Sequence, residues 1–559
     1  MKANKFFLGL ALIGAILTGC DKGQEPETNG GEAKAYMSVR ISMASTAGTR
    51  ATTDGGFAVG TADEQKINAS KSIFLFYDEN GKWVTSGQLA TSTGTGGENH
   101  TSTEGQDHYG EPDGKDINDY HESAYIVLSG PDDELQLSRK VLAVVNYSKC
   151  ESLKNLDLNQ ALAALATDAT GEDPADAGTN GFLMSTSVYY DGTNFVNTTA
   201  ITGDNIKPTV AEATGKPVDI YIERAAAKAD FTISTEDDFG LLTGNGGEGD
   251  KRIIVDGKLS NAKVTITGWN LNNVYKQTYV VKHLLDAWKT TAPFKGYAWN
   301  WKENHRSYWA MGQNWGGSGA GGKYVRAYKD AAGRAVDGSV VAYCYENTVE
   351  TPDCDPNTPD PNVNTVLIAA KLEVPTTPTG KDWEAGKNLY EYAGVFYRET
   401  TYFELILKQI KEKGYKKSGG ADYVIGDLEI KPLGGGSLAG IKFKVNNKDS
   451  QLIDGKDVEA FVNDLAYVTE TKGYAGGKCY YQIPVEHLGY VDDDPKKPNY
   501  GMVRNHWYKI NVSAINHVGD AVFDDTVVIP GIPEKNQEYY LSAKIHVLSW
   551  HVVKQSVEL

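Results

Sequence analysis

The stretch AYMSVRISM, residues 35–43, alternates apolar and polar side chains along its whole length. Successive side chains of a β-strand point to opposite faces, so a period of two predicts a strand with one buried face. We expect that face to be formed by Met37, Val39, Ile41 and Met43. The stretch therefore predicts a half-buried strand in a β-rich chain.

A run of small and polar residues, STAGTRATTDGG at 45–56, follows this strand directly. Such a run cannot bury enough apolar surface to order itself, which makes it an open target for a protease. Arg50 is its only basic residue, so the expected cut lies between Arg50 and Ala51. Cutting there would detach the strand before it and leave an apolar groove lined by unpaired backbone groups.

The removable strand is expected to contribute strongly to stability. Four apolar side chains at about 1.5–3 kcal/mol each give about 6–12 kcal/mol in gross terms, and each ladder hydrogen bond adds about 1 kcal/mol net. A strand supplied by a neighbouring molecule would therefore bind firmly in the vacated groove.

The first residues have the pattern of a secretory signal, with Lys2 and Lys5 before an apolar run from Phe6 to Leu17. That run is too short for a bilayer, which takes about 20 residues in a helix. The sequence Leu-Thr-Gly before Cys20 is a lipobox, and the polar stretch 21–32 reads as a tether. We expect a lipid on Cys20; an ordinary signal with an incidental cysteine is the alternative.

The overall composition narrows the function classes. A net charge of −18 argues against a nucleic-acid partner. The remaining cysteines, at 150, 344, 354 and 479, have neither zinc-site nor disulfide-framework spacing. A bridge between Cys344 and Cys354 and isolated buried thiols both stay open.

The chain is predicted to be mainly all-β, because it holds 60 Gly and 32 Tyr and shows many short apolar runs closed by turn residues. Short helices are expected at 153–165 and 401–411, where apolar residues recur at spacings of three and four. Many strands with few helices favour antiparallel β-sandwiches. The strands are expected at 72–77, 124–128, 141–146, 218–222, 263–267, 340–345, 365–374, 440–445, 478–485 and 507–515.

These patterns divide the chain into a signal peptide at 1–20, a propeptide with the tether and removable strand at 21–50, an N-terminal sandwich domain at 51–225, a C-terminal sandwich domain at 226–538 and a tail at 539–559. Apolar residues alternate in two parts of the tail: Leu541, Ala543, Ile545 and Val547, then Val553, Val557 and Leu559. The tail either completes its own domain's sheet or is donated to another copy.

The sequence motifs of phosphate-binding loops, helical zinc sites and hydrolases are incomplete or absent. The run GSGAGGK at 317–323 ends before Tyr324, where a phosphate-binding loop needs Ser or Thr. His100, His108 and His121 lack the spacing of a helical zinc site. The chain also lacks a G-x-S-x-G or H-E-x-x-H motif. We therefore predict no enzyme activity, no cofactor and no metal site.

Several segments together resemble the fimbrillins of Porphyromonas and related Bacteroidetes, the subunits of type V pili. They are the lipobox ending at Cys20, AYMSV at 35–39, TRA at 49–51, VVN at 144–146, FLMS at 182–185, IERA at 222–225, YCYENT at 343–348, YYQIP at 480–484 and RNHWYKI at 504–510. They span nearly the whole chain in order.

The resemblance implies two transthyretin-like or Ig-like antiparallel sandwich domains and export as an outer-membrane lipoprotein carrying palmitate on Cys20. It implies cleavage after Arg50 by an Arg-specific, gingipain-type protease, then donor-strand exchange by the tail to form a homopolymer. Expected partners are anchor and tip subunits and host or bacterial receptors, which would serve adhesion, coaggregation and biofilm formation.

The alternative is a monomeric surface lipoprotein that binds glycans or host proteins. In that case Trp299, Trp301, Trp309 and Trp315 would form a stacking platform, although the same residues are better explained as core or loop anchors. The two hypotheses differ in what they require of Arg50 and of the tail.

Overall fold

Strands dominate the chain, and the predicted all-β class of antiparallel sheets with a few short helices is confirmed. The computed structural model describes residues 35–43, 57–58, 64, 67–89, 121–130, 132–167, 181–209, 212–213, 216, 218–247, 249–313, 315, 322–349, 362–490, 498–529 and 550–558. Within these ranges no helix is both long and apolar enough to cross a membrane.

The N-terminal part is a nine-stranded sheet that closes on itself. Its strands run in the order β10-β6-β3-β4-β5-β1-β12-β7, and β7 pairs again with β6, so the strands from β6 to β7 form a ring. A short strand, β11, pairs with β1. The bounds are β1 Ala35–Met43, β3 Ile73–Tyr77, β4 Trp83–Leu89, β5 His121–Leu128, β6 Lys140–Val145, β7 Met184–Thr186, β10 Thr199–Ala200, β11 Ile206–Lys207 and β12 Val218–Arg224.

Apolar side chains fill the inside of this ring and also cover part of its outside. Phe74 and Phe76 of β3 point into the inner cluster, while Ile73 and Leu75 pack against helix α3, Leu158–Thr167. Because β3 is buried on both faces, its sequence IFLFY is apolar throughout rather than alternating. Helix α2, Asp132–Leu135, lies between β5 and β6 in the chain.

The C-terminal part is built around two five-stranded sheets that share one apolar core. One has the order β2-β34-β32-β13-β22 and the other β14-β17-β23-β29-β33. Trp269 and Phe231 stack in the core between them. The bounds are β2 Phe57–Ala58, β13 Ala226–Ile233, β14 Leu241–Leu242, β17 Ala262–Asn272, β22 Asp337–Tyr345, β23 Thr365–Glu373, β29 Lys478–Pro484, β32 His506–Ala514, β33 Asp520–Ala521 and β34 Trp550–Glu558.

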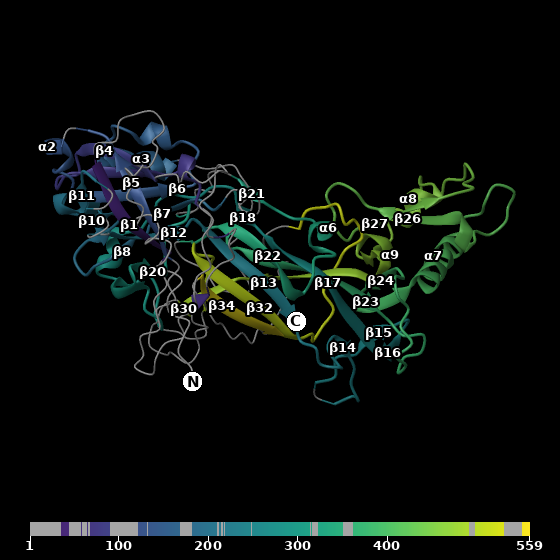
Figure 1. Cartoon of the computed structure of the whole chain (residues 1–559). Helices are drawn as coiled ribbons and strands as arrows, with labels where there is room; N and C mark the ends of the chain where they lie inside the picture. Colours follow the sequence, from purple (N-terminus) through teal and green to yellow (C-terminus); the bar gives the residue numbers. More distant parts are fainter. Residues whose placement is uncertain are drawn as a thin grey trace, which may run out of the picture.

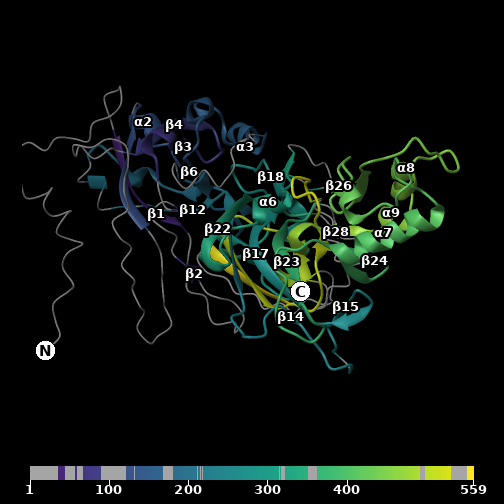
Figure 2. The ribbon, with the colours of Figure 1, turned by 90° about the vertical axis from the view of Figure 1, so that its right-hand side faces the viewer.

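A third five-stranded sheet and a helical region extend this sandwich on the side away from the N-terminal ring, as both views show (Figures 1 and 2). Helix α7 packs its apolar face on the hairpin β26–β27. The bounds are β15 Ile253–Val255, β16 Lys258–Ser260, β24 Leu389–Tyr392, β25 Val395–Arg398, β28 Lys472–Tyr474, β26 Leu428–Pro432, β27 Ile441–Val445, α7 Glu399–Lys413, α8 Val458–Asn463 and α9 Ala466–Thr469.

Smaller elements complete the fold. They are β8 Tyr189–Tyr190 with β9 Phe195–Val196, β18 Val274–Tyr275 with β21 Lys323–Tyr324, β19 Asn300–Trp301 with β20 Arg306–Ser307, β30 Glu486–Tyr490 with β31 Pro498–Tyr500, and helix α6 Tyr328–Ala331.

Two details differ from the sequence-based expectation. Helix α3 begins at Leu158 rather than Leu153, because the Asp157 carboxylate accepts a hydrogen bond from the Trp83 backbone N–H and its carbonyl accepts one from Ala161. Within the mainly antiparallel sheets, β1–β12, β13–β32, β32–β34 and β15–β25 pair in parallel. Parallel neighbours need a long crossover, so local patterns could not reveal them.

Candidate functional site

Strand β1 lies inside the closed ring, between two strands formed much later in the chain. It pairs antiparallel with β5, from Ala35 opposite Leu128 to Ser42 opposite His121. On its other side it pairs in parallel with β12, from Val39 opposite Val218 to Met43 opposite Ile222. Both edges of β1 are therefore occupied by backbone partners.

The predicted buried face of β1 packs into the core of the ring. Met37 and Val39 are fully buried in the same apolar cluster as Ile126, Leu128 and Ile220. Ile41 and Met43 lie further along the strand, at the register positions of Ile220 and Ile222 in β12.

Removal of β1 would open the ring along a slot between β5 and β12, which we call the β1 slot. The slot would expose unpaired N–H and C=O groups on both neighbours together with the apolar side chains that Met37 and Val39 now cover. Such an open edge pairs readily with any strand of matching pattern. Chemically, such a slot would suit an extended peptide whose apolar and polar side chains alternate.

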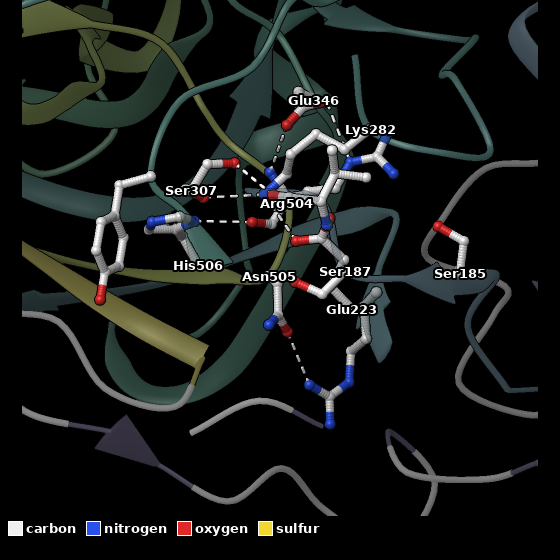
Figure 3. Close-up of polar contacts among 12 residues, drawn as sticks. Ser185, Ser187, Glu223, Lys282, Ser307, Glu346, Arg504, Asn505 and His506 are labelled. Carbon is white, nitrogen blue, oxygen red and sulfur yellow. Dashed lines mark hydrogen bonds and ion pairs between the residues drawn. The ribbon is translucent and has the colours of Figure 1, made fainter. Parts of the chain in front are cut away.

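A cluster of buried charged groups joins the ring to the C-terminal sandwich (Figure 3). At its centre the fully buried Arg504 donates from Nε to Oε2 of Glu346 at 3.1 Å. Its two terminal nitrogens donate to the carbonyl oxygens of Val280 and Tyr279 at 3.1 and 2.6 Å, and to Thr278 Oγ1. The guanidinium thereby ties the segment after β18 to the residues before β32.

A second buried pair reaches into the ring itself. Lys282 Nζ lies 2.7 Å from Oε2 of Glu223, the last residue but one of β12, and donates to the carbonyl of Ser307 at 2.9 Å. Burial lowers the pKa of Lys282, and the Glu223 carboxylate opposes that shift. Ser185 of β7 adds a hydrogen bond from its hydroxyl to the Val280 carbonyl.

A third group surrounds Glu64, which lies beyond the predicted cleavage site in the chain. Its Oε1 lies 2.7 Å from Lys228 Nζ and accepts a hydrogen bond from the Tyr343 hydroxyl. Its carbonyl accepts one from Nε of Arg224, whose Nη1 donates to Asn505 Oδ1. Burial raises the pKa of Glu64, but Lys228 and Tyr343 outweigh it and hold that pKa below its usual value. Burial lowers the pKa of Arg224 to about 10.

The three groups, which we call the buried junction, consist of Glu64 and of residues from the ring, from the segment 278–307, and from strands of the sandwich or the residues next to them. Leaving one partner of a buried pair uncompensated is strongly unfavourable, so the pairs restrict how the two parts fit together. Sequence analysis marked 222–225 and 504–510 but assigned their charged residues no role. The available signal was the charged pair Glu223-Arg224 placed between the apolar residues Ile222 and Ala225.

The C-terminal strand β34 lies in a sheet of its own chain. It pairs in parallel with β32, from His551 opposite His506 to Glu558 opposite Ala514, and antiparallel with β2. Val553 and Val557 lie on this strand. Residues 550–558 of the tail therefore pair within their own chain, and residues 539–549 lie outside the described residues.

The other residues singled out from the sequence are only partly placed. Those outside the described residues are Cys20, Arg50, Ala51, Leu541, Ala543, Ile545, Val547 and Leu559. The described part of the chain holds no group of three or more His, Cys, Asp or Glu side chains suited to a metal ion. Cys344 is buried, and its thiol is in contact with the sulfur of Met502.

The tryptophans proposed as a stacking platform serve mainly as anchors. Trp309 is buried beside Phe294, and Trp299 and Trp315 pack against the same cluster while half-buried. Trp301 packs on the core of the sandwich. Lys323, from the glycine-rich run, donates to Asn362 Oδ1. These placements give no specific support to a glycan platform or a phosphate site.

Comparison with known proteins points to one class. Residues 472–556 match the family model described as major fimbrial subunit protein type IV, fimbrillin, C-terminal. This region contains β28 to β33 and most of β34. No curated protein sequence matches the chain. The C-terminal region therefore has the sequence pattern of a fimbrillin C-terminal domain.

Solved structures give a weaker likeness. A fimbrilin from Porphyromonas gingivalis W83 is 12% identical, with 94% of this chain and 98% of that chain covered and a TM-score of 0.34. A putative cell adhesion protein from Parabacteroides distasonis is 10% identical, with coverage of 94% and 99% and a TM-score of 0.35. The tip fimbrial protein Mfa3 from P. gingivalis is 10% identical, with coverage of 85% and 94% and a TM-score of 0.28. Scores this low carry no functional conclusion.

Replacing Glu346 by Ala should destabilise the protein by about 3–5 kcal/mol, because it leaves the Arg504 charge buried without its partner. Urea unfolding followed by tryptophan fluorescence measures the change. Glu303→Ala is the matched control: its side chain is 63% exposed in a loose pair with Lys302, so the expected change is below about 0.5 kcal/mol. Equal effects of the two substitutions would contradict a structural role for the junction.

Replacing Met37 by Ala should destabilise the uncleaved protein by about 2–5 kcal/mol, since a fully buried side chain leaves a cavity in the ring. The same denaturation experiment applies, with Arg50→Ala present to keep the chain intact. Leu137→Ala, at a side chain that is 56% exposed, is expected to change stability by less than about 0.5 kcal/mol. A Met37 variant as stable as the parent would show that β1 does not pack in the ring.

Proposed function

We propose that the chain is the structural shaft subunit of a cell-surface fimbria, polymerised by donor-strand exchange. The observation that carries the proposal is the position of β1: the strand that ends just before the protease-susceptible stretch is an internal member of a closed sheet. The fimbrillin match over residues 472–556 supports the fimbrial class.

Maturation would proceed from a lipid-anchored precursor. Residues 1–20 direct export, Cys20 carries the lipid in the outer membrane, and residues 21–50 are the propeptide. A gingipain-type, Arg-specific protease cuts between Arg50 and Ala51 and releases β1 with its anchor. This leaves a mature N-terminal domain at 51–225 and a C-terminal domain at 226–538, with the β1 slot open.

The tail of a second copy is the proposed occupant of the slot. Leu541, Ala543, Ile545 and Val547 alternate with Ser542, Lys544 and His546, as Met37, Val39, Ile41 and Met43 alternate with Ser38, Arg40 and Ser42. Setting Leu541 at the position of Met37 aligns every apolar residue, pairs Ser542 with Ser38 and pairs Lys544 with Arg40. The same faces of the strand are thus apolar and polar.

The strand pairing of the tail also suits this exchange. In its own sheet β34 has one parallel neighbour, β32, and one antiparallel neighbour, β2. β1 likewise has parallel β12 and antiparallel β5. The proposed donor residues 541–547 precede β34 in the same chain, so a tail that entered the slot in the direction of β1 would meet parallel β12 and antiparallel β5.

The assignment to the shaft rests on the two features that polymerisation needs in every copy. The chain has a cleavage site at Arg50 and a donor-like tail at 539–559, and in sequence it resembles the shaft subunit of the minor, short fimbria of Porphyromonas gingivalis. Its partners would be further copies of itself, anchor and tip subunits, and host or bacterial receptors. The fibre would serve adhesion, coaggregation and biofilm formation.

Treatment of purified precursor with an Arg-specific protease should convert monomers into a ladder of high-mass species on electrophoresis without boiling. Arg50→Ala should remain monomeric because the slot stays filled, and deletion of residues 540–559 should be cleaved and stay monomeric because no donor is present. Monomers throughout would overturn polymerisation. A ladder from the deletion variant would overturn the role of the tail alone.

Replacing Ile545 by Asp should lower the yield of polymer at least tenfold after cleavage, because a carboxylate would have to enter the apolar slot. His546→Asp, which places the same group on the polar face of the strand, should change the yield less than about twofold. Quantified gel densitometry after equal digestion times measures both. Equal loss from the two variants would show that the proposed register is wrong.

A further inference from the structure

The short strand β2 covers the outer edge of the C-terminal strand. Phe57 lies opposite His551 and Ala58 opposite Trp550, and β2 is the first strand in the order β2-β34-β32-β13-β22. β2 comes from the segment just after Arg50, whereas β1 comes before it. The strands on the two sides of the predicted cut therefore belong to different sheets. β1 lies in the ring, and β2 lies on β34.

Glu64 fixes the other end of this segment. It is 1% exposed, its carboxylate is bound by Lys228 and Tyr343, and its carbonyl accepts a hydrogen bond from Arg224. All three partners belong to or adjoin the sandwich that contains β34. In the uncleaved chain, β2 is therefore tethered on both sides, by β1 before it and by Glu64 after it.

We propose, on the basis of the proposed function, that β2, with Glu64 as its downstream anchor, is a latch. It holds the C-terminal strand in its own sheet until cleavage after Arg50. The same cut then does two things: it frees β1 from the acceptor slot, and it removes one of the two tethers that keep β2 on β34. The β1 slot and the donor tail therefore become ready for strand exchange at the same time.

The effective concentration of β2 near β34 explains how cleavage would be coupled to release of β34. Two residues make few ladder hydrogen bonds, so β2 stays on β34 mainly because both ends hold it nearby at a high effective concentration. Loss of one tether lowers that concentration and lets the edge of β34 open more often. In the intact precursor both tethers keep β2 on β34, which prevents the tail from being donated before cleavage.

The C-terminal strand has to leave its sheet for the exchange to occur. Only Leu548 and Ser549 separate the proposed donor residues, ending at Val547, from β34, starting at Trp550. Three residue steps span at most about 10 Å. A tail inserted along the slot of another copy therefore draws β34 away from β32 and β2, and any contact that retains β34 opposes assembly.

Hydrogen–deuterium exchange of residues 550–558 tests the latch. Precursor cleaved after Arg50, with excess synthetic peptide 35–43 to keep the slot filled and the protein monomeric, is compared with uncleaved Arg50→Ala under the same conditions. The latch predicts at least tenfold faster exchange of these amides after cleavage, with β13 unchanged. Equal rates in the two proteins would overturn it.

A reversible lock provides the second test. Cα atoms of directly opposed strand residues lie about 4.5–5.5 Å apart, within the range of a disulfide, so Ala58→Cys with Trp550→Cys should join β2 to β34. Cys20 and Cys354 are replaced by Ala throughout, and Cys150, Cys344 and Cys479 are buried. The oxidised protein should be cut after Arg50 yet give at least tenfold less polymer, with full recovery in dithiothreitol.

The outcomes of these experiments distinguish failure of the latch from failure of the proposed polymerisation. Ala58→Cys alone should polymerise under both conditions. If the oxidised double variant polymerises like the parent, β34 does not have to leave its sheet and the latch is wrong. If the cleaved parent itself stays monomeric while its 550–558 amides exchange faster, the proposed polymerisation fails and the latch stands.

Discussion

The pairing of β1 with β5 and β12 is the constraint on which the rest of the structure depends. The N-terminal sheet closes through β6 and β7, so β1 is not an edge strand that could be lost without consequence. A closed sheet leaves no unpaired backbone along its ring, and the absence of any one member creates two exposed edges at once. Because Met37 and Val39 also fill the core, the same strand supplies both ladder hydrogen bonds and apolar packing.

The buried junction gives this ring a fixed position on the sandwich. Buried ion pairs are weak evidence for high stability, since the desolvation of both charges offsets much of their attraction. These pairs restrict the relative position of the ring and the sandwich more than they add stability. Glu223 has to meet Lys282 and Glu346 has to meet Arg504, because otherwise charges would be buried without a partner. A subunit that transmits force along a fibre would benefit from such a defined relation between its two parts. Glu64 extends the junction to the segment that follows the predicted cleavage site.

Local patterns predicted the elements of this fold better than their assembly. Alternation over residues 35–43 identified β1 and its buried face, and apolar runs located most of the long strands, because both signals are contained in a few consecutive residues. Ring closure by β6 and β7, the parallel partners of β1 and β32, and the hydrogen bonds of Arg504 depend on residues separated by much of the chain. Nothing local distinguishes Glu64 from an exposed carboxylate. Its role follows only from the basic groups that the fold brings to it.

The most direct measurement of the central claim is a disulfide between the slot of one copy and the tail of another. Val218 of β12 lies opposite Val39 of β1, and the proposed register puts Ala543 of the incoming tail in place of Val39. A chain carrying Val218→Cys and Ala543→Cys, cleaved after Arg50 and oxidised, should form covalent ladders that survive boiling in SDS and collapse on reduction, while the uncleaved chain stays monomeric. Polymers that form after cleavage without this intermolecular disulfide would contradict the account.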